Sequence, residues 1–407
     1  MSINVAKYFL VSGVALFSLG LLVACGGEVR EVVKEVPVDR IVEKEVIKVV
    51  EVVKEVPIEK VVTKEVVKEV VKEVIKEVEK VVTVVVTATS VPDSPTAKFL
   101  TLSNDSPHVT VIDAETNLVI KTADIPDILK WTWNDDNNYF DGQNVWLGLK
   151  FPEADDAVVI ALNVDTLEVA SRLSVGKEPK NIYMGKATKS GILHIGKQGS
   201  GEVVTIDTNS AKVLETWDTV PVNEGVVCDA DIGIGPDGVE RFYYPTQNGD
   251  TVVAINPDTG ETIAETNTPE GAVPLMHTNA PDGRMWVQES GSNTNAVFDP
   301  VTLELVKRFA SAKGPVVGTF SPNGEYAYIG HFGDPTVQVI DTETLEEVTQ
   351  ITVGNTPSKI AVHPNGKYIY AIASKESAVS VIETGSWKVS GRVALAGNPN
   401  GMFLWED

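Results

Sequence analysis

The stretch PSKIAVHPNGKYIYAIASKESAVSVIETGSWKVSGRVALAGNP, residues 357–399, decides the fold. It contains four short runs rich in β-branched and aromatic residues: SKIAV, YIYAIA, AVSVIE and KVSGRV. Turn-forming residues separate these runs as HPNG, SKES and TGS, and AGNP follows the last one. Apolar runs bounded by Gly, Pro, Asn and Ser predict four antiparallel strands joined by tight turns.

The third of these strands recurs along the chain. Its pattern is a set of alternating β-branched residues followed by Asp or a substitute, and it ends at Asp113, Asp165, Asp207, Asn256, Asp299, Asp341 and Glu383. A Pro-Asp/Asn-Gly turn precedes the second strand at 236–238, 281–283, 322–324 and 364–366. Four strands per repeat, repeated seven times, predict an all-β, seven-bladed β-propeller over residues 97–407.

The two ends of this region predict how the ring closes. The run AKFLTL at 97–102 has no innermost strand before it, and NGMFLWE at 400–406 is a strand without a blade of its own. We expect the C-terminal strand to complete the first blade, because closure removes the free sheet edges that invite aggregation.

The repeat resembles the YVTN family of seven-bladed propellers, which are surface or exported proteins. The resemblance is carried by FSPNGEYAYIG and VQVIDTETLEEVTQITVGNTP within 320–357, and by VHPNGKYIYAI and VSVIETGSWKV within 362–389. It covers roughly residues 97–407, is weaker in blades one, two and four, and lacks the literal YVTN string. The resemblance implies a scaffold and no particular chemistry, because members of the family do not share one activity.

The N-terminus predicts export and lipid attachment. An apolar stretch after Lys7 is too short and too rich in small residues for a membrane span. It ends in Leu22-Val23-Ala24-Cys25, which matches the bacterial lipobox. We therefore expect residues 1–24 to be a lipoprotein signal peptide and Cys25 to carry the lipid that holds the protein to the outer face of the cell membrane. A plain secretory signal is the alternative.

Residues 25–90 are predicted to be a stalk or spacer. They consist mostly of Val, Glu and Lys, and EVVKEVP occurs at 31–37 and again at 51–57. Near residues 65–82 the apolar positions recur close to the helical period, which favours a helical stalk that forms homo-oligomers. Valine and like charges four residues apart oppose an isolated helix, so a solvated spacer is the alternative. A short linker follows at 91–96.

Charge and cysteine content exclude some functions. The net charge of −23 argues against unaided binding of nucleic acid. The chain has two cysteines, Cys25 and Cys228, so lipidation of the first leaves no intramolecular disulfide. No c-type haem motif, phosphate-binding loop or nucleophile elbow is present.

Candidate ligands cluster in blades four to six. Carboxylates and imidazoles from adjacent blades can converge on a divalent cation. The candidates are Asp229 and Asp231 in the first strand of blade four, His277 in that of blade five, and Glu289 and His331 at the ends of second strands. The alternative is that each is a hydrogen-bonded structural residue, since no known metal-binding spacing links them.

The ends of the second strands also predict a binding rim, because propellers bind ligands beside the loops that follow these strands. Counting back about ten residues from each repeat terminus gives Ser103, Lys150, Lys197, Thr246, Glu289, His331 and Ser374. His194 lies inside a predicted strand and is expected to be a satisfied interior histidine. The aromatic insertion 131–146 is interpreted as core aromatics, with a sugar or peptide clamp as the alternative.

Three hypotheses follow. The first is a lipid-anchored, non-catalytic binding module outside the cytoplasm, with a protein, a cell-wall component or a small molecule as ligand. The second is a metal-binding protein or metal-dependent enzyme that uses the residues of blades four to six. The third is a solute-capture lipoprotein, because the spacer resembles that of some bacterial substrate-binding lipoproteins. The sequence lacks the two-lobed α/β pattern of such receptors, which argues against the third hypothesis.

Overall fold

The computed structural model divides the chain into two compact units, residues 1–95 and 96–407. The residues that it describes are 46–51, 62–64, 66–71, 86–88, 97–103, 106–125, 139–150, 156–178, 182–218 and 231–406. The predicted signal peptide, Cys25, Cys228, most of the predicted stalk and the predicted linker fall outside these ranges. No helix among the described residues is long and apolar enough to span a membrane.

The first unit contains four short strands among its described residues. Strand β1 (Val46–Glu51) pairs with β3 (Val66–Val71), and β2 (Val62–Lys64) pairs with β4 (Val86–Ala88), both antiparallel. In these stretches the backbone is extended, so the helix favoured by the sequence periodicity is not formed there. The β-branched side chain of valine accounts for this, since it favours extended backbone.

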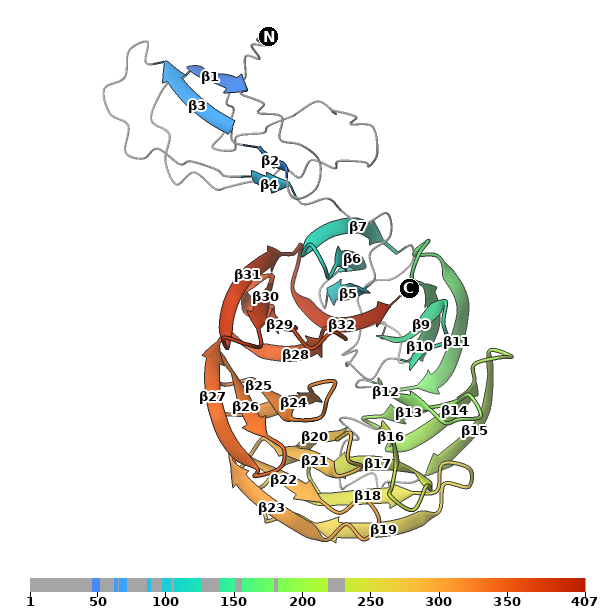
Figure 1. The fold of residues 1–407 in the computed structure, drawn as a ribbon. Coiled ribbons are helices and arrows are strands. Elements are labelled where there is room, and N and C mark those ends of the chain that lie inside the picture. The colour runs from blue at the N-terminus through green and yellow to red at the C-terminus, as the bar shows by residue number, and fades with distance from the viewer. Residues whose placement is uncertain are drawn as a thin grey trace. The chain divides into compact units, whose positions relative to one another are not determined.

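The second unit is the predicted seven-bladed propeller (Figure 1). Blade one consists of β32 (Pro399–Glu406), β5 (Ala97–Ser103), β6 (His108–Asp113) and β7 (Leu118–Asp124). Blade two consists of β8 (Tyr139–Phe140), β9 (Asn144–Lys150), β10 (Asp156–Asn163) and β11 (Val169–Lys177). Blade three consists of β12 (Ile182–Ala187), β13 (Ile192–Lys197), β14 (Glu202–Asp207) and β15 (Lys212–Asp218).

The remaining blades follow the same order from the innermost to the outermost strand. Blade four consists of β16 (Asp231–Ile234), β17 (Glu240–Thr246), β18 (Thr251–Ile255) and β19 (Thr262–Asn267). Blade five consists of β20 (Pro274–Asn279), β21 (Met285–Glu289), β22 (Thr294–Phe298) and β23 (Leu305–Ala310). Blade six consists of β24 (Pro315–Phe320), β25 (Tyr326–His331), β26 (Thr336–Asp341) and β27 (Glu346–Thr352). Blade seven consists of β28 (Pro357–Val362), β29 (Tyr368–Ala373), β30 (Ala378–Glu383) and β31 (Lys388–Ala394), with the 3₁₀ turn η1 (Ser374–Glu376).

The expected closure is confirmed. Strand β32 pairs antiparallel with β5 from Pro399 opposite Ser103 to Glu406 opposite Ala97. Blade one is therefore built from the two ends of the propeller region, and β32 is its innermost strand (Figure 1).

The polar residue that ends the repeat pattern in each blade precedes a turn of common geometry after the third strand. In blade six, Asp341 Oδ1 accepts hydrogen bonds from the N–H groups of Glu343 and Thr344, and Leu345 then adopts a left-handed φ of 56°. The residue four positions after the turn-forming residue has a positive φ in all seven blades: Asn117, Leu167, Ala211, Gly260, Leu303, Leu345 and Trp387. This common geometry fixes the hairpin between the third and fourth strands.

Blade two corrects one position of the predicted repeat. Strand β10 ends at Asn163, whose Oδ1 accepts hydrogen bonds from the N–H groups of Asp165 and Thr166. The terminus of the repeat in this blade is therefore Asn163, and the prediction of Asp165 was wrong by two residues. The Asn-Val-Asp sequence offered two polar residues of the same class, and hydrogen bonding selects the one at the strand end.

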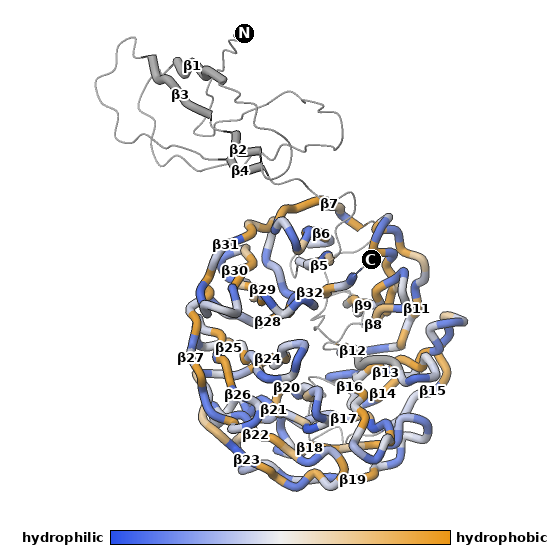
Figure 2. Tube along the Cα trace, viewed as in Figure 1, coloured by the Kyte–Doolittle hydropathy of each residue, from blue (hydrophilic) through white to orange (hydrophobic). Residues whose placement is uncertain are grey.

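The core lies between the blades. Between blades seven and one, for example, Phe99 and Tyr370 are fully buried and their ring centroids lie 4.6 Å apart. Burying such a side chain stabilises the fold by roughly 1.5–3 kcal/mol. Apolar residues also occur on the outermost strands, which carry orange stretches in Figure 2. Val119 of β7 and Val306 of β23 are exposed there.

Candidate functional site

The two ends of the propeller carry different loops. We call the end with the turns between second and third strands and the connections between blades the loop face, and the opposite end the turn face. The predicted rim positions and two of the candidate ligands, Glu289 and His331, lie at the loop face because they end second strands.

The rim positions share a structural role. In four consecutive blades the residue at the end of the second strand binds the residue five positions later, at the start of the third strand. The pairs are Lys197 with Glu202, Thr246 with Thr251, Glu289 with Thr294, and His331 with the carbonyl of Thr336. Different residue types thus hold the same turn. Whether these positions also bind a ligand stays a prediction.

The other rim positions differ in detail. The hydroxyl of Ser374 lies 2.9 Å from that of Ser358 on the innermost strand β28, and Ser103 Oγ accepts a hydrogen bond from the N–H of Asn398. Lys150 ends β9 as expected, but its side chain lies outside the described part of the chain.

Glu289 belongs to a buried ion pair. Its carboxylate is fully buried and accepts two hydrogen bonds from Arg308, at 2.7 Å from Nε and 2.9 Å from Nη2. Thr294 donates a third at 2.6 Å. A bidentate guanidinium pair of this kind satisfies the carboxylate, so its oxygens are engaged within blade five.

His331 lies in a hydrogen-bonded chain at the same face. Its Nδ1 lies 2.8 Å from the carbonyl oxygen of Thr336 and its Nε2 lies 3.0 Å from Ser311 Oγ. Ser311 also donates to Gln338 Oε1, and Gln338 Nε2 donates to Glu347. Burial lowers the pKa of His331, since removal from water disfavours the imidazolium.

Asp231 and His277 face the same boundary, between blades four and five. Asp231 begins β16 and is fully buried, and Asn279 Nδ2 of β20 donates to its Oδ2 over 3.2 Å. His277, also of β20 and buried, has its ring centroid 6.2 Å from that of Tyr243 in blade four. A Cβ on Gly233 would lie 2.6 Å from Asn279 Oδ1, so glycine there permits the approach of the two strands.

The predicted five-residue metal set does not come together among the described residues. No group of three or more His, Cys, Asp or Glu side chains in the described ranges is placed to hold a metal ion. Glu289 and His331 are engaged with other partners at the loop face, whereas Asp231 and His277 face the boundary between blades four and five. Asp229 lies outside the described residues, so a site that combines it with Asp231 and His277 stays a prediction.

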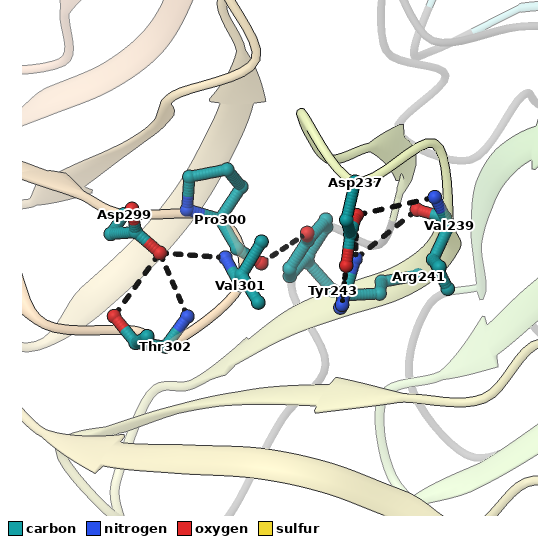
Figure 3. Close-up of polar contacts among 8 residues, drawn as sticks. All are labelled: Asp237, Val239, Arg241, Tyr243, Asp299, Pro300, Val301 and Thr302. Carbon is teal, nitrogen blue, oxygen red and sulfur yellow. Dashed lines mark hydrogen bonds and ion pairs between the residues drawn. The ribbon is translucent and has the colours of Figure 1, made fainter.

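At the turn face, side chains cross from one blade to the next. The hydroxyl of Tyr243 donates to the carbonyl of Pro300 over 2.6 Å (Figure 3), and that of Tyr370 donates to the carbonyl of Ala114 over 2.8 Å. Burial raises the pKa of Tyr243 to about 12. His194 fills the corresponding position of blade three, with Nε2 2.7 Å from the carbonyl oxygen of Pro257. His194 is buried as expected, but only Nε2 has a hydrogen-bond partner among the described residues and Nδ1 has none, so the expectation of a satisfied interior histidine is confirmed in part.

Beside this bond lies a turn-face ion pair. Arg241 donates to Asp237 over 3.0 Å from Nη1 and 2.6 Å from Nη2, and Nη1 also donates to the carbonyl of Val239 (Figure 3). The hydrogen bond from Arg241 lowers the pKa of Asp237 to about 2. These contacts fix the turn between the first and second strands of blade four.

At the loop face, acidic and amide side chains instead hold loops. Asp250 accepts hydrogen bonds from the N–H groups of Gly271 and Val273, at 2.6 and 2.8 Å, and so links a turn of blade four to the connection that leads to blade five. Asn293 accepts from Gly314 N at 2.8 Å in the next blade. The loop face is therefore organised before any ligand arrives, which reduces the entropic cost of binding.

The sequence interpretation missed Lys359. This lysine of β28 is fully buried, and burial lowers its pKa to about 7. The sequence did contain a signal for this lysine. Lys359 lies two residues after the proline that begins its strand, and the same position holds Met276 and Val317 in the two preceding blades. A lysine at a position that other blades fill with apolar residues indicates an unusual environment.

Comparison with known proteins supports the fold. No family model and no curated protein matches the chain. Solved structures do. A gluconolactonase described as periplasmic, from Pseudomonas aeruginosa, is 15% identical with a TM-score of 0.59, covering 76% of this chain and 98% of its own. AztD from Citrobacter koseri is also 15% identical, with a TM-score of 0.54 and the same coverage.

A third solved structure has another name. It is NirN, described as a dihydro-heme d1 dehydrogenase, which is 14% identical with a TM-score of 0.53 and covers 74% of this chain and 64% of its own. The chain has the seven-bladed propeller fold. At these identities the likeness extends to the fold alone, since one propeller scaffold carries unrelated functions.

Proposed function

We propose that this protein is a binding module of the YVTN propeller type, anchored by lipid at Cys25 outside the cytoplasm, which presents its loop face to a ligand. The observation that carries the proposal is the organisation of that face. Asp250 and Asn293 hold the connections between blades. The hydrogen bonds made by Lys197, Thr246, Glu289 and His331, one in each of blades three to six, hold the turns between second and third strands. Such a surface holds a fixed shape on a rigid scaffold, as binding sites require.

The turn face is the matched comparison surface. The hydrogen bonds of the turn face, such as that from Tyr243 to the carbonyl of Pro300, run from one blade to the next and join the blades into a ring. The hydrogen bonds of the loop face instead hold its loops in shape. A ligand at the loop face therefore leaves the ring's own contacts intact. Loops held by a rigid scaffold are where propellers carry variable recognition.

Site-specific photo-cross-linking tests the proposal. A photo-reactive residue is placed at exposed Lys313 or Lys375 of the loop face, and at exposed Lys189 or Lys367 of the turn face as controls. In cells that carry the full chain, we expect adducts of one defined mass from the loop-face positions. Adducts confined to the turn face, or equal from both faces, would contradict the proposal.

The anchor is tested separately. Cys25→Ser removes the thiol that the lipobox presents for lipidation, and we expect this variant to leave the membrane fraction. Retention of the variant in that fraction would refute lipid anchoring and leave the loop-face proposal to be judged by cross-linking.

A second candidate function is cation binding at the boundary of blades four and five. It is favoured by the buried carboxylate of Asp231 facing Asn279, with His277 on the same strand as Asn279. Carboxylate, amide and imidazole groups suit a divalent cation. Elemental mass spectrometry of the purified protein should then find a stoichiometric metal that Asp231→Asn removes. A metal content unchanged by Asp231→Asn and by His277→Phe would rule this candidate out.

A further inference from the structure

Lys359 lies where the ring closes. In blades five, six and seven the innermost strand begins with a proline, and the residue two positions later is Met276, Val317 and Lys359 in turn. Met276 and Val317 each pack in the apolar cluster formed with the following blade. By this repeat, Lys359 faces blade one, whose innermost strand is β32.

Blade one is held differently from the other six. Its innermost strand comes from the C-terminus, and hydrogen bonds between β32 and β5 join it to the rest of the blade. In every other blade the innermost strand is followed directly in the chain by the second strand. Release of β32 from β5 would therefore open the ring without disturbing any other blade's internal pairing.

The surroundings of Lys359 disfavour a charge. The side chain is fully buried, and Ala361, Tyr370 and Met402 belong to the apolar cluster between blades seven and one. Burial is the cause of the lowered pKa, to about 7. The titratable side chains of the strands packed against β28 are Tyr326, Tyr328 and His331 on β25, Tyr368 and Tyr370 on β29, and Glu406 on β32, with Lys98 on β5 behind β32.

We propose that the boundary between blades seven and one is a proton-sensitive closure, in which Lys359 is neutral while β32 is paired and its protonation favours release of β32. When β32 leaves, Lys359 gains water and binds a proton at its ordinary affinity. The open form therefore holds one proton more than the closed form between the two pKa values, about 7 when closed and about 10.4 when solvated. The closed ring is most stable above that interval and loses stability as the pH falls through it.

Linkage sets the size of the effect. A difference of one bound proton changes an equilibrium about tenfold per pH unit. From pH 9 to pH 7 the opening equilibrium of β32 should therefore rise about fiftyfold, because Lys359 of the closed form is itself half protonated at pH 7. Below pH 7 this contribution should level off.

Hydrogen–deuterium exchange of peptides covering β32 and β5 measures this opening in the purified protein. After correction for the intrinsic effect of pH on exchange, the native chain should show a nearly tenfold rise per unit from pH 9 to pH 8 and a smaller rise from pH 8 to pH 7. Lys359→Met, which places there the residue found in blade five, should abolish the slope. Lys375→Met removes an exposed lysine of the same blade and should keep it.

A second variant guards against a folding defect in the first. Lys359→Val introduces the residue of blade six and should likewise give pH-independent exchange. If the native chain has no slope, or if both variants keep the slope of the native chain, the closure is not governed by Lys359. The proposal does not depend on the ligand of the loop face.

Discussion

The turn face and the loop face use the same kinds of polar side chain for different purposes. At the turn face, Tyr243, Tyr370 and His194 each reach a backbone carbonyl of the next blade. At the loop face, Glu289 and His331 each hold the turn of their own blade, while Asp250 holds a connection. The comparison teaches that one end of the propeller maintains the ring and the other maintains the shape of its loops.

The largest expected effect is at the loop face. Arg308→Ala leaves the fully buried carboxylate of Glu289 without its ion-pair partner, and we expect a loss of about 3–5 kcal/mol in the free energy of unfolding. Denaturant titration measures it. Arg392→Ala, which removes an exposed partner of Glu376, should cost far less. Equal effects of the two variants would mean that burial does not decide the strength of these pairs.

Next comes a turn-face bond. Tyr243→Phe removes the hydroxyl that satisfies the carbonyl of Pro300, and we expect a loss of about 1–3 kcal/mol in the free energy of unfolding. Tyr370→Phe should behave alike, because it removes the equivalent bond to Ala114. A negligible effect of both would show that packing alone joins the blades, and would break the comparison between the faces.

Lowering the pH should reduce the stability of the fold through one buried histidine at each face. Burial lowers the folded-state pKa of His194 and of His331, so protonation favours the unfolded chain. This part of the stability is present above the unfolded pKa of about 6.5 and is lost as the pH falls from there through the folded pKa. Thermal unfolding between pH 7.5 and 5 should show the loss, and His194→Tyr should remove the turn-face share. A steeper acid loss in that variant would contradict the assignment.

The smallest effect is expected from an exposed pair of hydrogen bonds between two blades. Lys121 Nζ donates to the carbonyls of Asp165 and Thr166 at 2.6 and 2.9 Å near solvent. Lys121→Met should lower the free energy of unfolding by no more than about 1 kcal/mol, as for other solvated contacts. A loss as large as that of Tyr243→Phe would show that exposed ties also hold the ring.

The candidate site was less predictable than the fold. The repeat gave the positions of Glu289 and His331 at the ends of second strands, and the structure places them there. The predicted metal role required their side chains to converge with those of neighbouring blades, and this depends on strand spacing and side-chain direction across blades. The structure instead gives each a partner nearby in its own blade, Arg308 and Thr336. Lys359 was missed because burial is a property of the assembled ring.

Sequence by itself determined the number of blades, their order and the closure by the C-terminal strand, because turn residues and alternating β-branched runs act locally and recur. Only the tertiary structure decided which polar residues meet. Asp231 and Asn279 are 48 positions apart in the chain, and Tyr370 and Ala114 are 256 apart. Contacts at such separations depend on how neighbouring blades pack, and a local pattern carries no information about that packing.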